Sequence, residues 1–138
     1  MIERRFDHVA VEVDDLDHFI SLFSETGALH LIRTGTLNAT GQRIAMLGDG
    51  TGARIELIEN PQATTPSLSH LALRVNSVDE ARSDLMRVGW AHVRGPNDLA
   101  AAHARSALLC DQSGLHLQLI SYRADSPDLE AGTKSENR

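Results

Sequence analysis

The sequence has little of what several protein classes require. It contains a single cysteine, Cys110, so no disulfide can form within the chain, which favours a reducing compartment. Aromatic residues make up only 4% of the chain, which leaves few rings for stacking a large planar ligand. No apolar run approaches the roughly 20 residues needed to cross a bilayer. The start, MIERRFDHVAVEV, also lacks the apolar stretch of a secretory signal. We therefore expect a cytoplasmic protein with no membrane contact.

Positive charge is scarce as well. The chain carries 13 Lys and Arg against 19 Asp and Glu, for a net charge of -6, and it contains no run of basic residues. Nucleic-acid binders typically show a basic patch or stripe, so DNA and RNA are not expected partners. The 138 residues, of which 41% are hydrophobic and 23% charged, are typical of a soluble globular protein with a substantial core.

The chain is a tandem repeat. Sliding it by 62 positions lays residues 7–58 over 69–120 without a gap, so that DHVAVEVDDLDHFISLFSETG falls on SHLALRVNSVDEARSDLMRVG. Of the 52 aligned positions 16 are identical, including His8 with His70 and His30 with His92. Such self-similarity at a fixed period indicates repeated structural units. We predict two copies of one unit, at about residues 5–60 and 67–122.

Each copy has the pattern strand, helix, strand, strand, strand, which predicts an α+β fold. HVAVEV and HLALRV alternate with period two, as half-buried strands do. The first helix is expected after Asp14 and Asp15 and ends at Gly27, and the second begins at a Ser77-x-x-Glu capping box and ends at Gly89. The remaining strands are expected at about 29–34, 42–48, 53–59, 91–94, 105–110 and 115–121.

Both copies are expected to form one domain over residues 1–123. The segment after them, ADSPDLEAGTKSENR, is polar and lacks hydrophobic periodicity. We therefore predict that residues 124–138 form a disordered tail.

The repeat pairs four residues that can bind a metal. His8 and Glu56 in the first copy have the same spacing along the chain as His70 and Gln118 in the second. Strand alternation places His8 and His70 on the face opposite the apolar residues that pack under the helices. Two imidazoles with oxygen donors suit a divalent Zn, Ni, Co, Mn or Fe ion and leave positions open for water or substrate. We predict one metal ion per site, held by these four residues.

The same alternation predicts the substrate-binding residues. Glu12 shares a face with His8, Arg54 with Glu56, Arg74 with His70, and His116 with Gln118. If the copies are related by a pseudo-twofold axis, these faces converge on one concave surface. The two arginines are candidates for holding an anionic small-molecule substrate, and His116 is a candidate for contacting it.

Several motifs resemble the vicinal oxygen chelate superfamily over residues 7–122. They are His8 in DHVAVEVDDLD, Asp49-x-x-Gly52 before ARIELIE, His70 in SHLALRV, and Asp111-x-x-Gly114 before LHLQLIS. The resemblance implies paired βαβββ modules that form a curved, open, barrel-like mixed sheet with the helices outside. It also implies a metal held by the first and last strands of each module, and a homodimer.

The metal-site pattern is most similar to those of glyoxalase I and methylmalonyl-CoA epimerase. This resemblance implies an isomerase, epimerase or lyase that moves a proton next to the metal-chelated carbonyl of a small oxygenated substrate. The base must be a carboxylate, because an amide cannot accept the proton. We therefore predict that Glu56 is the catalytic base. Gln118 departs from the family pattern, where Glu is common, and leaves one base, which suits one-sided proton transfer better than two-sided racemisation.

Glutathione is not the expected substrate. Glyoxalase I carries an Arg four residues after the first ligand, whereas this sequence has Glu12 there, which would repel a glutathione carboxylate. Asn60, four residues after Glu56, matches a glutathione-contacting Asn of that family, but Pro61 and Gln62 replace the Trp-Gly that follows it.

Two other functions remain open. An Fe(II)-dependent ring-cleaving dioxygenase would use the positions of His8, His70 and Gln118, but Gln118 breaks the two-His-one-carboxylate triad. A metal-free antibiotic-binding protein would generally lack the histidines and supply aromatic residues, and this chain does the opposite. The sequence also leaves open whether one chain builds the site or two chains exchange modules.

Overall fold

The computed structural model describes residues 4–129 and confirms the predicted element order. The first module consists of β1 (Arg4–Val13), α1 (Leu16–Glu25), β2 (His30–Thr36), β3 (Arg43–Gly48) and β4 (Arg54–Glu59). The second consists of β5 (Ser67–Val75), α2 (Val78–Arg87), β6 (Ala91–Leu99), β7 (Ala104–Cys110) and β8 (His116–Tyr122). Strand β6 is longer than the expected 91–94.

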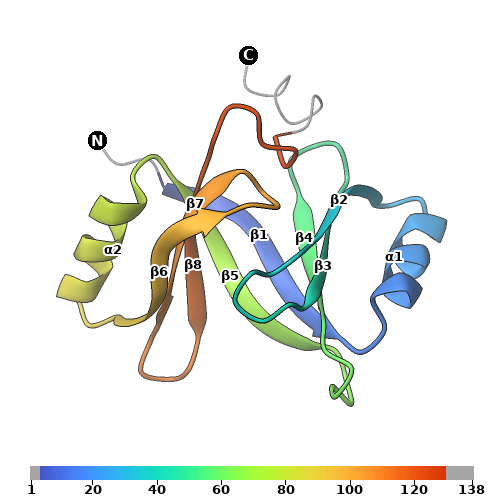
Figure 1. Ribbon diagram of the computed structural model, residues 1–138, viewed down its shortest axis with the longest axis horizontal. Helices are drawn as coiled ribbons and strands as arrows, with labels where there is room; N and C mark the ends of the chain where they lie inside the picture. Colours follow the sequence, from blue (N-terminus) through green and yellow to red (C-terminus); the bar gives the residue numbers. More distant parts are fainter. Residues whose placement is uncertain (1–3, 130–138) are drawn as a thin grey trace.

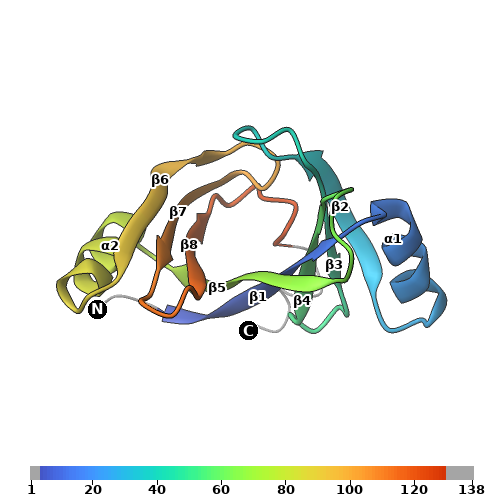
Figure 2. The same ribbon diagram turned by 90° about the horizontal axis from the view of Figure 1, so that it is seen from below.

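All eight strands form one mixed sheet in the order β2-β3-β4-β1-β5-β8-β7-β6. β1 and β5 pair antiparallel at its centre, and each pairs in parallel with the last strand of its own module, β4 or β8. The sheet curls into an open half-barrel with α1 and α2 at opposite ends of its outer side (Figures 1 and 2). The predicted α+β fold of paired βαβββ modules in a curved, open sheet is confirmed.

Each helix covers a separate apolar core. Leu16 of α1 packs with Val13 and Leu57, and Val78 of α2 packs with Val75 and Leu119. The expected N-caps are present, because the side chains of Asp15 and Ser77 accept backbone hydrogen bonds from His18 and Glu80. Both helices have ten residues, far short of the roughly 20 that a membrane crossing requires. The helices thus cover the apolar faces of β1 and β5, and the other faces of these two strands line the inside of the curved sheet.

The gapless repeat fails at one place. In the first module His30 pairs with Gly48, and in the second Ala91 pairs with Cys110, which lies one full repeat length after Gly48. Ala91 lies one position short of a repeat length after His30. The first halves of β2 and β6 therefore correspond at an offset one position shorter than the other strands, so His30 and His92 are not at equivalent positions. The second shift in β6, between Arg94 and Asn97, restores the repeat length. An edge strand can absorb this change, because only one neighbour fixes its register.

The segment after β8 differs from the expected disordered tail. Ser126 and Asp128 are 3% and 0% exposed, and the Asp128 carboxylate binds the Arg33 guanidinium through two contacts, Nε to Oδ1 at 2.6 Å and Nη2 to Oδ2 at 3.1 Å. The backbone carbonyl of Asp128 also accepts a hydrogen bond from Arg54. Disorder is therefore a wrong expectation for residues 126–128, and residues 130–138 lie outside the described part of the chain.

Removing the Asp128 carboxylate is expected to destabilise the fold. Asp128→Ala leaves the buried Arg33 guanidinium without its two-contact partner, which should lower the free energy of unfolding by about 3 kcal/mol. Equilibrium urea denaturation measures the change. Asp125→Ala is the matched control, because its carboxylate is 72% exposed and its loss should change stability by less than about 0.5 kcal/mol. Equal stability of the two variants would contradict a structural role for this segment.

Candidate metal centre

The four predicted ligands lie on two rows of side chains that cross the inner face of the sheet. Paired residues in neighbouring strands point to the same side. One row runs from β2 to β5 and contains Arg33, Met46, Glu56, Ala10 and His70. The other runs from β6 to β1 and contains Arg94, Leu108, Gln118, Ala72 and His8. In each row an alanine stands between the two candidate ligands, which leaves space between them.

The candidate ligand atoms converge in the space beside these alanines. Oε1 of Glu56 lies 3.9 Å from Nε2 of His8 and 3.7 Å from Nε2 of His70, and the three ligand atoms lie within 4.8 Å of one another. These separations are too long for hydrogen bonds and lie within the reach of one shared ion. His8, Glu56 and His70 are 1%, 6% and 9% exposed, and all belong to one chain, so module exchange is not needed to assemble them.

A bulge orients each histidine. The register between β1 and β5 shifts at Asp7 and again at Ser69, so the residue before each histidine is left out of the pairing. Nδ1 of His8 lies 2.6 Å from Oδ2 of Asp7, and Nδ1 of His70 lies 3.1 Å from Oγ of Ser69. Strict alternation would turn Asp7 and Ser69 to the opposite face, which is why the sequence analysis missed both of them.

The hydrogen bonds leave three atoms unpaired at the same place. Nε2 of His8, Nε2 of His70 and Oε1 of Gln118 are buried and have no hydrogen-bond partner among the described residues. The Gln118 amide donates from Nε2 to Oγ of Ser106 at 3.1 Å, which keeps its carbonyl oxygen free. Buried polar atoms rarely stay unpaired, so three at one point call for a ligand. Two nitrogen donors and two oxygen donors fit a divalent first-row metal ion.

Electrostatics fix which nitrogen of His8 faces Asp7 with a proton and keep His70 neutral. The hydrogen bond from His8 and the charge of Arg54 outweigh burial and lower the pKa of Asp7, so this carboxylate is ionised and the proton lies on Nδ1 of His8. Burial lowers the pKa of His70 to about 4, although the charge of Glu56 opposes the shift. A neutral His70 imidazole at pH 7 presents a lone pair, which metal binding requires.

This shift predicts how the stability of the metal-free protein depends on pH. The pKa of His70 is about 4 in the folded chain against the ordinary 6.5, so between these values the unfolded chain binds more protons. Stability should be full above pH 6.5 and fall by up to about 3 kcal/mol as the pH drops to 4. Urea denaturation across this range measures it. His70→Gln should make the free energy of unfolding nearly independent of pH in this range, whereas His18→Gln should leave its pH dependence unchanged. An unchanged pH dependence in His70→Gln would show that His70 is not its cause.

Arg33 was missed by the sequence analysis and contacts the candidate base. Its Nη2 lies 3.4 Å from Oε2 of Glu56, while Nε and the same Nη2 bond the Asp128 carboxylate. A bulge between Leu31 and Arg33 aims this side chain along its row. Although burial opposes it, the bond to Asp128 raises the pKa of Arg33. The segment after β8 is thereby linked to Glu56 through a permanently charged residue.

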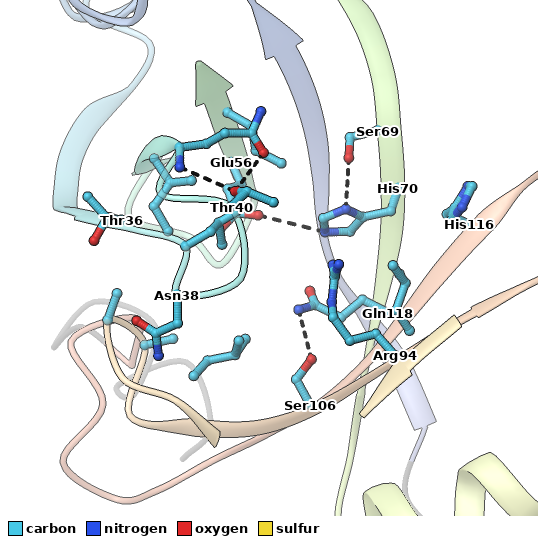
Figure 3. Close-up of a pocket in the computed structure, with 18 of the residues that line it drawn as sticks. Thr36, Asn38, Thr40, Glu56, Ser69, His70, Arg94, Ser106, His116 and Gln118 are labelled. Atoms are coloured by element: carbon cyan, nitrogen blue, oxygen red, sulfur yellow. Dashed lines mark hydrogen bonds and ion pairs between the residues drawn. The ribbon is translucent and has the colours of Figure 1, made fainter. Parts of the chain in front are cut away.

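A cavity of about 460 Å³ opens beside the cluster on the inner side of the half-barrel (Figure 3). Glu56, His70 and Gln118 line it, whereas His8 does not. Of the predicted substrate residues, Glu12 and His116 line the cavity, and Asn60 instead donates from Nδ2 to Oε1 of Glu12 at 3.0 Å. The described lining residues include no Phe, Tyr or Trp.

Comparison with known proteins fits this arrangement. The sequence profile of the Glyoxalase/Bleomycin resistance protein/Dioxygenase superfamily matches residues 7–108. The chain belongs to this superfamily. No curated protein sequence matches the chain.

Solved structures share the fold of this superfamily member. Methylmalonyl-CoA epimerase from Mycobacterium tuberculosis is 24% identical, with a TM-score of 0.76 over 86% of this chain and 87% of its own. A hypothetical protein from Bacillus halodurans is 19% identical, with a TM-score of 0.74 over 90% and 98%. A variant of Streptomyces coelicolor methylmalonyl-CoA epimerase in complex with 2-nitronate-propionyl-CoA is 21% identical, with a TM-score of 0.74 over 88% and 96%.

Two arginines of this superfamily member do not lie where the sequence analysis expected. Arg54 and Arg74 are absent from the cavity lining, and their guanidinium carbons each lie 5.4 Å from the centre of the Tyr122 ring. Arg54 is 6% exposed and forms an ion pair with Asp7. Strand alternation predicts the face of a sheet but not what covers it. Here the end of β8 and the segment after it cover the positions that were expected to face substrate.

Proposed function

We propose that this member of the superfamily is a divalent-metal-dependent enzyme that moves a proton on a carbon next to a carbonyl of a small oxygenated substrate. The observation that carries the proposal is the convergence of unpaired atoms from His8, His70 and Gln118 beside the Glu56 carboxylate. A metal ion bound by these four residues would polarise a substrate oxygen as a Lewis acid. The convergence of four donors from both modules is difficult to explain by packing alone.

Glu56 is the proposed catalytic base. It is the carboxylate of the cluster, it lines the cavity, and its Oε2 is held by Arg33 while Oε1 faces the two histidines. A carboxylate fixed on one side can accept a proton from substrate and return it. Glu12, the other acidic lining residue, accepts a hydrogen bond from Asn60 and lies one row away, opposite Ile58. This asymmetry supports proton transfer at one face of the substrate.

The structure supports some of the predicted substrate-binding residues better than others. These residues are Glu12, Arg54, Arg74, His116 and Asn60. The cavity gives Glu12 and His116 direct access to a ligand. Arg54 acts indirectly and does not contact the cavity, because it neutralises the Asp7 carboxylate that orients His8. A small-molecule substrate fits the cavity volume of about 460 Å³, whereas glutathione stays disfavoured by Glu12 in the cavity lining.

An Fe(II) oxygenase is the second candidate. The cluster itself contains two histidines and one carboxylate, His8, His70 and Glu56, which is the ligand set of non-haem iron oxygenases. This arrangement differs from the family pattern because the carboxylate comes from β4 and not from β8. A metal-free binding protein is less favoured, since the unpaired buried atoms of His8, His70 and Gln118 would then have no metal to bind.

Metal content tests the proposal directly. The purified, dialysed protein is analysed by mass spectrometry before and after loading with Mn, Fe, Co, Ni or Zn, and we expect close to one ion per chain. The loaded protein is then incubated in D₂O with methylmalonyl-CoA, the compound that appears in the names of the structural neighbours, and with simpler 2-hydroxy ketones. Deuterium uptake next to the carbonyl supports proton transfer, and dioxygen consumption by the iron form that depends on added substrate supports the second candidate. No metal under any loading would exclude both enzymes.

A further inference from the structure

Arg33 and Arg94 are equivalent residues of the two modules. Arg33 pairs with Met46, Arg94 pairs with Leu108, and these two partners are separated by the repeat length. A bulge precedes each arginine, between Leu31 and Arg33 and between His92 and Arg94. The sequence hides this equivalence because the halves of β2 and β6 that contain the two arginines correspond at the shorter offset. The pseudo-twofold axis therefore puts one arginine at the outer end of each row.

The two arginines have different surroundings. Arg33 has two acidic partners, Asp128 at 2.6 Å and Glu56 at 3.4 Å, and its side chain is 7% exposed. Arg94 lines the cavity, is exposed, and has no hydrogen-bond or ion-pair partner in residues 4–129. The second module places Gln118 at the position of Glu56, so the acid that neutralises Arg33 has no counterpart beside Arg94.

The Arg94 side chain points into the cavity beside Gln118 and His70 (Figure 3). Strand β6 lies very close to β7 next to Arg94: a Cβ added at Gly95 would lie only 2.7 Å from the backbone oxygen of Ser106. The geometry thus presents a guanidinium without an acidic partner next to the candidate metal ligands.

We propose that Arg94 binds an anionic group of the substrate, a carboxylate or phosphate separate from the oxygens that approach the metal. A guanidinium donates two parallel hydrogen bonds to such a group. The substrate would lie across the pseudo-twofold axis, with its anionic end toward Arg94 and Gln118 and its acidic carbon toward Glu56. The orientation rests on the proposed metal site, whereas anion binding by Arg94 stands on the cavity alone.

The first experiment compares two metal-chelating probes in the cobalt-loaded protein by isothermal titration calorimetry. Butyrohydroxamate and the monohydroxamate of succinate offer the same pair of oxygens to a metal, and only the second carries a carboxylate. We expect the native protein to bind the carboxylate probe at least tenfold more tightly. Arg94→Gln should reduce this preference to within about twofold and leave the affinity for butyrohydroxamate unchanged. Arg87→Gln removes the same charge from an exposed position on α2 and should retain the full preference.

A second experiment separates this proposal from the metal site. The metal-free protein, labelled with ¹⁵N at arginine, is titrated with succinate and followed by NMR. A shift of one side-chain Nε–H signal that disappears in Arg94→Gln supports the anion site even if no metal binds and the proposed function fails. No response to succinate in the native protein, or a carboxylate preference that persists in Arg94→Gln, would overturn the proposal.

Discussion

His8→Ala and His70→Ala are each expected to weaken metal binding by a factor on the order of a hundred to a thousand. Each substitution removes one of the four proposed metal ligands, which would share a binding free energy of about 10–16 kcal/mol as in structural zinc sites. His8 should give the larger loss, because the charge of its Asp7 partner raises the basicity of Nε2, whereas His70 has the neutral Ser69. Competition with a fluorescent chelator at pH 7 measures the affinity of each variant.

The matched control is His18→Ala, which removes an exposed histidine from α1 without touching the cavity. Its metal affinity should equal that of the native chain. Thermal unfolding of the metal-free variants distinguishes a lost ligand from a misfolded protein, since both variants should still unfold cooperatively. Native metal affinity in either His8→Ala or His70→Ala would refute the assignment of that residue.

Glu56→Gln is expected to retain metal and to lose turnover by about a hundred- to ten-thousandfold. An amide carbonyl can still bind a metal, which is the role proposed for Gln118 at the equivalent position of the second module, but it cannot accept a proton. The substitution removes the charge of the side chain but keeps its shape. Arg33 therefore loses an ionic contact but can still donate a hydrogen bond to the amide oxygen. Turnover is measured as deuterium exchange with whichever substrate the loaded native protein accepts.

Glu12→Gln is the informative control for this prediction. Glu12 and Glu56 are the acidic residues of the described cavity lining, so the two variants remove the same charge from the same cavity. Glu12→Gln should keep turnover within about tenfold of native. If Glu12→Gln loses turnover and Glu56→Gln keeps it, the base is Glu12 and the proposed role of Glu56 is wrong.

Strand alternation predicted the inner face of the sheet correctly wherever the pairing is regular. It placed the apolar residues of the first strand under α1, where Val13 packs, and Glu56 and Gln118 lie on the opposite face. It failed at the bulges, where an extra residue changes the side to which the chain turns. Asp7 and Arg94 both lie at such register shifts, and neither was identified from the sequence. A bulge has no reliable signature in one sequence because it is a property of two paired strands.

The buried side chains show a second limit. Arg54 shares the predicted face with Glu56, yet it is covered by the Asp128 segment and Tyr122. Asp128 lies 95 residues from Arg33 in the chain, and its polar surroundings in the sequence resemble those of a disordered tail. The sequence contains no periodic signal for such a segment, because its ordering depends on one buried ion pair and not on a repeating apolar face.

By itself the sequence determined the two-module fold and the residue types at its centre, because a repeated pattern of apolar residues dictates both the elements and their faces. The spacing of His8, Glu56, His70 and Gln118 survived the change of offset in β2 and β6, since all four lie in the central strands. Only the tertiary structure decided which groups orient these residues and which charge faces the cavity. Hydrogen bonds and ion pairs between distant segments set those choices, and they follow from the closure of the half-barrel and not from local sequence.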